Sequence, residues 1–387
     1  MAVYRGKHVL LPGGEVLENG IIRTEGGTIT AIEETVNAEV DHDVNGWIVP
    51  GFVNAHCHLE LSHLKEKVAE KTGLPGFIQS VQSTREATAD EIETAIIEAD
   101  RQMWESGISA VGDICNGTDT ILCKKESPIT YHNFIEVFSF DPNRAHQAVE
   151  RAEAVMQSFM DEKLTHTSIT PHAPYSVSEK LFRLLLHHTG CYNAPMTIHN
   201  QETESENQLY RDGSGAMAEQ LRRFGLDLSH FRVRGVNSLP AYLVHFSKCS
   251  KTQLVHNTFT SEEDIDWAQQ YSTQLFWCAC PNANLYIENR LPNYPLWIEK
   301  NLKITLGTDS LASNHSLNML DEMRQIRNEY PKISTLEMLV WATENGADFL
   351  GLNIGRLRVG EAPGIVGIYE VDDNGDLTSQ SYSKRLE

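Results

Sequence analysis

Residues 51–58 read GFVNAHCH, a mostly apolar run that ends in two histidines, His56 and His58. In a β-strand, side chains two residues apart point to the same face, so we expect both imidazoles on one face of a strand. Seven more strand-like runs follow in alternation with amphipathic segments: 108–114, 129–138, 166–173, 195–200, 252–258, 273–281 and 303–309. Eight alternations of strand and helix predict an α/β fold, a (β/α)8 or TIM barrel, rather than an open doubly wound sheet.

The two ends of the chain follow a different pattern. Residues 1–48 read as short strands broken by glycine turns, and residues 364–380 repeat this style with an apolar strand and an Asp-Asn-Gly turn. We therefore expect residues 1–48 and 353–387 to pair into a small β-sandwich domain, with the barrel over residues 49–352. The stretch 225–250 is longer than an ordinary connection, and either a cover over the barrel mouth or a helix of the outer ring would account for it.

Composition narrows the class of partner. The net charge of −21 argues against binding to nucleic acid or to anionic membrane surfaces, and no apolar run approaches the ~20 residues that span a bilayer. The seven cysteines are odd in number and scattered, which indicates reduced thiols, and the first residues lack the apolar core of a secretory signal. We expect a cytoplasmic protein with a small-molecule substrate, and the sequence leaves open whether it is a homo-oligomer.

Further polar residues end other predicted strands. His199, His256 and Asp309 come at the carboxyl ends of the fifth, sixth and eighth runs. Active sites of TIM barrels are built at this end of the strands. A pair such as His56 and His58 can chelate one cation, but the pair alone is a weak signal because histidines also pack in cores. Four ends of strands that carry such residues make a common site the better interpretation.

Six motifs, in order along the barrel, resemble those of the amidohydrolase superfamily: PGFVNAHCH (50–58), SITPHAPYSVS (168–178), IHNQETESE (198–206), LVHNT (254–258), CPNANLYIENRLP (280–292) and LGTDSLASNHSLNMLDEMR (306–324). Within it they are similar to the branch of cytosine, guanine and S-adenosylhomocysteine deaminases. The segment HLELS (58–62) also looks similar to aminodeoxyfutalosine deaminases.

The resemblance implies a role for each residue of the site. Metal ligands would be His56, His58, His199 and Asp309; His256 and Asp309 would also orient the attacking water, and Glu202 would be the proton shuttle. The fourth run offers His172 but no lysine of the kind that bridges two metals in binuclear members, which implies one divalent metal ion. Zinc suits these ligands best, and iron and manganese are alternatives.

Other residues have competing interpretations. His172 and Glu60 would contact the substrate, although Glu60 fits a loop salt bridge equally well. Glu202 could instead be a solvated acid at a helix N-terminus. Cys278 and Cys280 resemble a soft-metal pair, but two thiols without a second pair more often pack as small apolar residues.

The implied activity is metal-dependent hydrolytic deamination of an amino-substituted heterocycle, of the adenosine or aminodeoxyfutalosine kind. The product would be the oxo compound and ammonia. Guanine or pterin deamination, a chlorohydrolase and a cyclic amidohydrolase are alternatives within the same enzyme class. A non-catalytic metal-binding module is the alternative outside that class, and it predicts the loss of a ligand or of Glu202, whereas all of them are present.

Overall fold

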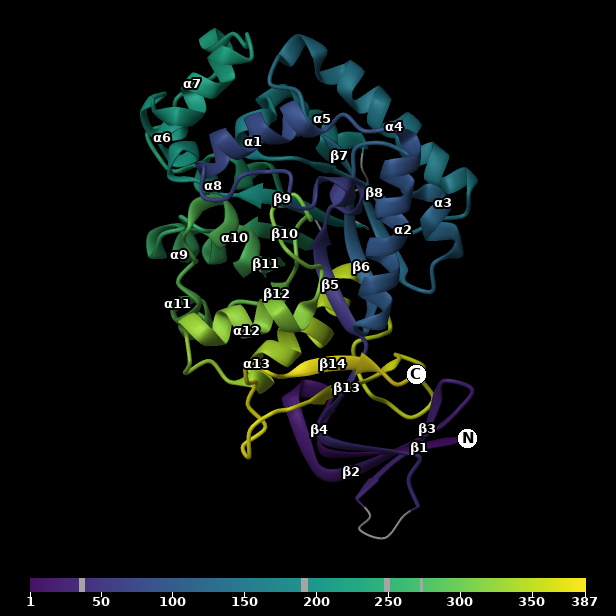
Figure 1. The fold of residues 1–387 in the computed structure, drawn as a ribbon. Helices are drawn as coiled ribbons and strands as arrows, with labels where there is room; N and C mark the ends of the chain where they lie inside the picture. Colours follow the sequence, from purple (N-terminus) through teal and green to yellow (C-terminus); the bar gives the residue numbers. More distant parts are fainter. Residues whose placement is uncertain (35–38, 189–193, 247–250, 272–273) are drawn as a thin grey trace.

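The computed structural model describes residues 1–34, 39–188, 194–246, 251–271 and 274–387. Its larger part holds two four-stranded parallel sheets with the strand orders β5-β6-β7-β8 and β12-β11-β10-β9 (Figure 1). Every strand overlaps one of the eight predicted runs: β5 (Phe52–Cys57), β6 (Ile108–Cys115), β7 (Thr130–Val137), β8 (Thr167–Pro171), β9 (Pro195–Asn200), β10 (Lys251–His256), β11 (Leu275–Ala279) and β12 (Ile304–Leu306). The predicted α/β class with parallel strands is confirmed. Of the predicted features, residues 247–250 and 273, Cys191 and Cys249 lie outside the described residues.

Backbone hydrogen bonds link the ends of the two sheets. The amide of His199 in β9 donates to the carbonyl of His172, just after β8, at 2.9 Å. At the other seam, the amides of Thr308 and Asp309 both donate to the carbonyl of His56 in β5 at 3.1 Å. These bonds join the carboxyl end of β8 to that of β9, and the carboxyl end of β5 to that of β12.

Helices surround these sheets. The α-helices are α1 (Gly73–Thr84), α2 (Ala89–Glu105), α3 (Ile121–Glu126), α4 (Ala145–Asp161), α5 (Glu179–His188), α6 (Glu204–Asp212), α7 (Gly215–Arg223), α8 (Ser238–Tyr242), α9 (Glu262–Tyr271), α10 (Pro281–Glu288), α11 (Tyr294–Glu299), α12 (Met319–Glu329), α13 (Thr335–Val340) and α14 (Gly346–Leu350). Short 3-10 turns are η1 (Pro12–Gly14), η2 (Leu59–Leu64), η3 (Pro142–Arg144), η4 (Pro174–Ser176), η5 (Leu228–His230) and η6 (Leu243–Phe246), and η7 (Trp341–Asn345) is a π-helical turn.

Helix α2 shows how the sequence sets these boundaries. Thr88 and Glu91 form a reciprocal capping box at its start. Its buried side, which includes Ile96 and Met103, belongs to the main apolar core. Gly107 follows the helix with φ 104°, a conformation that favours glycine, and the chain then enters β6 directly.

Both ends of the chain contribute to one six-stranded sheet, which lies below the larger part in Figure 1. Val366 of β13 faces Val49 of β4, so the C-terminal segment pairs with the strand that leads into β5. The order is β14-β13-β4-β1-β2-β3, from β1 (Ala2–Leu11), β2 (Glu15–Glu25), β3 (Thr28–Glu34), β4 (His42–Pro50), β13 (Ile365–Tyr369) and β14 (Tyr382–Arg385). The sheet has an apolar core of its own: Tyr4, Val9, Ile22, Ile29, Val44, Ile48, Leu357 and Ile365.

The long stretch from residue 225 divides into two parts with different surroundings. Residues 225–227 and His230 line a large cavity at the carboxyl ends of the strands. The second part, α8 and η6, contributes Leu239, Tyr242 and Phe246 to the main apolar core. The first part of the stretch thus borders the cavity, and the second part packs in the core as short helical turns.

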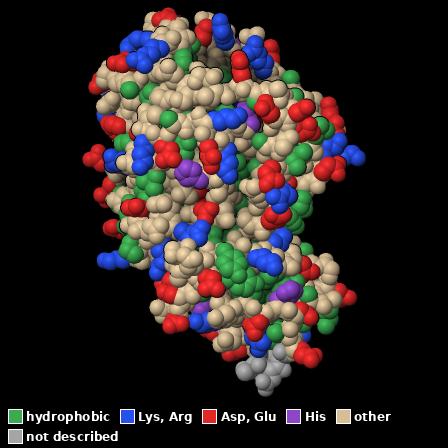
Figure 2. Space-filling view, in the orientation of Figure 1, with side chains coloured by type: hydrophobic (Ala, Val, Ile, Leu, Met, Phe, Trp, Pro, Cys, Tyr) green, Lys and Arg blue, Asp and Glu red, His purple; other side chains and the backbone are tan. Residues whose placement is uncertain are grey.

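The surface carries both signs of charge. Figure 2 shows acidic and basic side chains interspersed over one face, and a hollow at the top of the molecule, where Figure 1 places α4 and α7 on either side. Among the described residues, no helix is both long and apolar enough to cross a bilayer.

Candidate active site and metal centre

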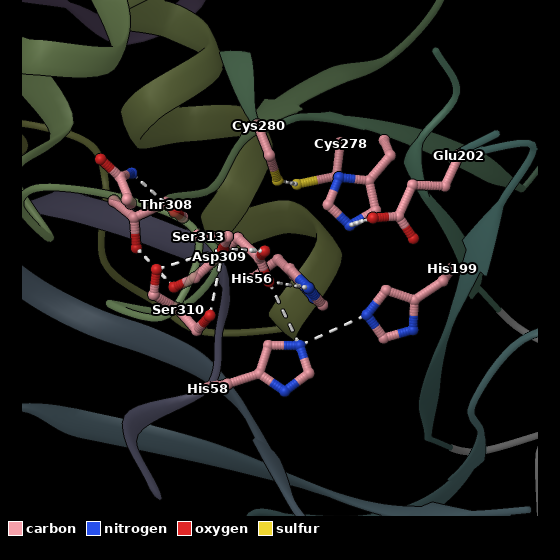
Figure 3. A network of polar contacts seen from close by, with 12 residues as sticks. His56, His58, His199, Glu202, Cys278, Cys280, Thr308, Asp309, Ser310 and Ser313 are labelled. Carbon is pink, nitrogen blue, oxygen red and sulfur yellow. Dashed lines mark hydrogen bonds and ion pairs between the residues drawn. The ribbon is translucent and has the colours of Figure 1, made fainter. Parts of the chain in front are cut away.

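Four histidines and one aspartate meet at the carboxyl ends of the strands. Nε2 of His56 and Nε2 of His58 lie 3.4 and 3.3 Å from Oδ1 of Asp309 (Figure 3). His58 Nε2 also lies 3.3 Å from Nε2 of His199. Candidate ligand atoms within 4.8 Å of one another come from four buried residues: His56, His199, His256 and Asp309. The structure thus brings together all five residues that the sequence pattern selected.

The backbone holds these side chains in a close arrangement. A Cβ added at Gly307 would lie 2.8 Å from Cβ of His56 and 2.9 Å from its carbonyl oxygen, so glycine is needed where the chain leaves β12 and passes β5. His256 and Asp309 have positive φ values of 70° and 58°. Such conformations are rare for residues other than glycine and cluster at functional sites.

Neighbouring polar groups orient the site. Nδ1 of His199 lies 2.9 Å from the carbonyl oxygen of His172, and a carbonyl can only accept, so the proton of a neutral His199 ring lies on Nδ1 and Nε2 is free. Oδ1 of Asn284 lies 2.8 Å from Nδ1 of His256 and can only accept, so the proton of a neutral His256 ring also lies on Nδ1. The hydroxyl of Ser313 donates to Oδ2 of Asp309.

Burial sets the charge state of these groups. It lowers the pKa of His58 to about 3, against the opposing effect of the Asp309 charge. Burial and the surrounding histidines also hold the pKa of His199 well below its usual value. Burial alone would raise the pKa of Asp309, but the histidines around it outweigh burial and hold this pKa well below its usual range. His58 and His199 are therefore neutral at pH 7, and Asp309 is ionised.

This arrangement fits a divalent cation. A metal ion needs neutral imidazoles and an ionised carboxylate, which are the states that these pKa shifts favour for His58, His199 and Asp309. Nδ1 of the buried His56 has no hydrogen-bond partner among the described residues, and its Nε2 has only the 3.4 Å contact with Asp309, so a ligand would satisfy a buried polar atom here. Nitrogen and oxygen donors of this kind suit zinc and comparable transition metals.

The segment that follows His58 is anchored by a buried ion pair. The amide of Leu59 donates to Oδ1 of Asp113 at 2.8 Å, and Oδ2 of Asp113 lies 2.5 Å from Nζ of Lys124. Both charged side chains are fully buried. Lys124 also donates to Oδ1 of Asn133 at 2.8 Å, so the ammonium has a second oxygen partner.

Glu202 lies beside the cluster rather than in solvent. Its Oε1 is 3.6 Å from Nε2 of His256, and its side chain is 6% exposed. Burial raises the pKa of Glu202 well above its usual value, and the negative charges of Asp309 and Glu288 raise it further. A carboxyl group that holds a proton near neutral pH can donate that proton to a bound molecule. The alternative of a solvated helix-terminal acid is wrong, because Glu202 is buried.

A cavity of about 770 Å³ opens above these residues, and His58, His199, Glu202, His256 and Asp309 all line it. His172 and Glu60 line it too. Burial lowers the pKa of His172 to about 4, and its Nδ1 is held 2.7 Å from the hydroxyl of Ser176. Glu60 pairs with Arg85 at 3.1 Å, as the salt-bridge interpretation predicted. It also lines the cavity, and its contact with the substrate stays a prediction.

The sequence pattern of the Amidohydrolase family matches residues 47–378. The chain belongs to the amidohydrolase family. An aminodeoxyfutalosine deaminase of a Nitratiruptor species is 29% identical over 339 residues, which cover 85% of this chain and 80% of that relative. The predicted resemblance to this superfamily is therefore confirmed.

Solved structures are similar to this amidohydrolase over nearly its whole length. Helicobacter pylori aminofutalosine deaminase in complex with methylthio-coformycin has a TM-score of 0.82 at 23% identity, over 97% of this chain and 94% of that chain. An adenosine deaminase from Xanthomonas campestris with bound zinc has a TM-score of 0.71 at 20% identity, over 94% and 83% of the two chains. At these identities the likeness shows the fold, which is of the TIM-barrel type.

Sequence reasoning missed Glu136 and Asn116, which also line the cavity of the amidohydrolase. Glu136 is the only acid in the apolar run 129–138 and lies near its carboxyl end. This is the signal that selected His199 and Asp309, and it could have selected Glu136. Asn116 lies just beyond the second run, and no pattern in the sequence marks it.

The described cysteines are not a metal site. Cys278 and Cys280 lie 3.9 Å apart between their sulfur atoms and are buried in a small apolar cluster with Ala55, Val255 and Ala283. Burial raises the pKa of the Cys280 thiol well above its usual value, which opposes the thiolate form that metals bind. All five cysteines that the structure describes are free, as expected for reduced thiols.

Proposed function

We propose that this chain is a metal-dependent deaminase that releases ammonia from an amino-substituted heterocycle of the nucleoside kind. The observation that carries the proposal is the placement of the buried Glu202, whose pKa is raised, beside His256, at the edge of a histidine and aspartate cluster that fits one cation. The names of its relatives, aminodeoxyfutalosine deaminase and adenosine deaminase, support the same reaction class.

The metal would be held by His56, His58, His199 and Asp309, with His256 beside it. Zinc is our choice because the donors are imidazoles and a carboxylate, and because the Xanthomonas campestris structure holds zinc. One ion is our choice because the described end of β8, Thr167–Pro171, contains no lysine. When bound, such an ion lowers the pKa of a coordinated water to about 7 and so supplies a nucleophile at neutral pH.

The protein's own residues would handle the protons. Glu202 holds a proton on its carboxyl group and gives it to a ring nitrogen, which makes the adjacent carbon more electrophilic. His256 and Asp309 accept hydrogen bonds from the attacking water and so direct it towards that carbon. Glu202, now a carboxylate, takes up a proton that the attacking oxygen loses and passes it to the leaving amine, so ammonia departs. The second proton of that oxygen returns to the Glu202 carboxylate as the carbonyl forms. His172 and Glu60 would contact the rest of the substrate, since both line the same cavity.

The finer architecture is also part of the proposal. We infer that the two four-stranded sheets close into one (β/α)8 barrel over residues 49–352, which the hydrogen bonds at both seams support. Residues 1–48 and 353–387 would form a β-sandwich by curling of the six-stranded sheet around its own core. Free thiols at the five described cysteines support a cytoplasmic location.

The proposal predicts ammonia release from a defined group of compounds. An enzyme-coupled ammonia assay of the zinc-loaded protein should detect turnover of at least one of adenosine, 5′-methylthioadenosine, aminodeoxyfutalosine, guanine and aminated pterins. Lactams and chlorinated triazines should not react, because their leaving groups are not exocyclic amines to which Glu202 could pass a proton. Turnover of lactams or chlorotriazines alone would exclude the proposed deamination but would not contradict the proposed metal site.

A further inference from the structure

One carboxylate in the cavity has an oxygen without a partner. Glu136 lies near the end of β7, and its side chain is only 4% exposed. Its Oε2 accepts a hydrogen bond from Nδ2 of Asn116 at 3.1 Å, whereas its buried Oε1 has no hydrogen-bond partner among the described residues. Buried polar atoms without partners are uncommon, and in a cavity wall they indicate a group that a ligand satisfies.

A role in orienting the metal ligand His199 does not explain why Oε1 of Glu136 has no partner. Glu136 Oε1 lies 3.6 Å from Nδ1 of His199, which is beyond hydrogen-bond distance. That Nδ1 already lies 2.9 Å from the carbonyl oxygen of His172 and has only one proton to donate. The neighbouring His172 ring directs its own Nδ1 to Ser176. The acceptor on Glu136 is therefore left for a molecule in the cavity.

Hydrogen bonds join Glu136 to Asn116, and Asn116 to Glu60, in one wall of the cavity. The backbone amide of Asn116 donates to Oε2 of Glu60 at 2.9 Å, and Arg85 binds Oε1 of Glu60 at 3.1 Å. Both oxygens of Glu60 thus have protein partners. Asn116 contacts both carboxylates, Glu60 through its backbone and Glu136 through its side chain, so it fixes their relative position.

This wall is built by other strands than those that carry Glu202 and His256, and it meets the metal cluster at His199, whose Nδ1 is 3.6 Å from Glu136 Oε1. Glu60, Asn116 and Glu136 follow or end β5, β6 and β7, whereas Glu202 and His256 lie at β9 and β10. A substrate whose ring reacts beside Glu202 would extend its non-reacting part towards Glu136. For a nucleoside, that part is the sugar, which carries hydroxyl donors.

We propose that Glu136 determines specificity by accepting, through Oε1, a hydrogen bond from a sugar hydroxyl of the substrate. The inference rests on the proposed function and adds the substrate group that this residue recognises. The nearby Arg85 already places a positive charge against this wall, which favours a neutral hydroxyl over a cationic group as the partner. A second cation bound by Glu136, His172 and His199, whose ligand atoms also lie within 4.8 Å of one another, is the rival occupant.

The test compares zinc-loaded wild type with Glu136→Gln on adenosine, 2′-deoxyadenosine and 3′-deoxyadenosine. Glu136→Gln keeps the shape but weakens the acceptor, so KM for adenosine should rise about 10- to 100-fold with kcat within a few-fold. The same substitution should have little effect on the one deoxynucleoside that lacks the contacted hydroxyl. Calorimetric binding of the three nucleosides to Glu202→Gln protein, with and without Glu136→Gln, should give the same pattern without turnover.

Controls separate the possible outcomes. Glu162→Gln, at an exposed carboxylate paired with Lys125, should match wild type. If Glu136→Gln does not fold, Glu136→Asp, which withdraws the oxygens by one methylene, makes the same comparison. Equal effects on all three nucleosides, or loss of a second bound zinc ion, would overturn this inference while the deaminase stands. Absence of ammonia from every amino-heterocycle with the wild type would overturn the proposed function and this inference with it.

Discussion

Zinc-loaded Glu202→Gln protein should fold and keep its metal but lose about 10²–10⁴-fold in kcat. The amide has the shape of the carboxyl group but cannot carry a proton between the ring nitrogen and the leaving amine. The structure supports a large effect because Glu202 is buried beside His256 and its pKa is raised, so it is a proton donor near neutral pH. Steady-state ammonia release, with zinc measured on the same samples, gives the result.

Glu204→Gln is the matched control, because Glu204 is two residues away and forms a surface ion pair with Arg211. It should stay within a few-fold of wild type. A metal-replete Glu202→Gln protein with nearly wild-type kcat would remove Glu202 from the mechanism.

Lys124→Met should lower the free energy of unfolding by about 3–5 kcal/mol, the usual cost of breaking a buried ion pair from one side. Without the ammonium, Asp113 would keep a fully buried negative charge with the Leu59 amide as its main partner. Urea unfolding followed by circular dichroism measures this change. Because Leu59 directly follows His58, the variant should also bind zinc more weakly.

Two comparison variants separate the effect of the buried Asp113 charge on stability from the effect of losing a lysine. Adding Asp113→Asn to Lys124→Met should restore part of the stability, because the amide leaves no buried charge and still accepts from Leu59. Lys125→Met, which breaks an exposed pair with Glu162, should change stability by no more than about 0.5 kcal/mol. A Lys124→Met protein as stable as the Lys125→Met protein would contradict the account of this ion pair.

The ends of the strands were the most predictable part of the molecule. His56, His199 and His256 each lie at the carboxyl end of an apolar run. Parallel strands bring these ends together irrespective of the length and conformation of the loops. The fold class followed from the same alternation, since it depends on local periodicity.

The residues that depend on contacts between distant segments could not be predicted. Asn116, Asn284 and Lys124 act through partners on other strands or helices, and nothing local distinguishes them from surface polar residues. Lys124 and Lys125 are adjacent in the sequence, but Lys124 is buried and Lys125 lies on the surface. Only the packing of α3 against β6 and β7 decides which of the two lysines is buried. The ion pair of Glu60 likewise depends on where Arg85 lies.

The most direct test of a single-metal deaminase is a zinc titration of metal-stripped protein, with ammonia release measured on the best nucleoside substrate. A single-metal deaminase should show no turnover without metal, and its rate should rise in proportion to zinc and level off at about one ion per chain. His199→Ala and Asp309→Ala should hold less zinc at the same concentration. Full turnover by metal-free protein, or a plateau reached only at two ions per chain, would contradict the account.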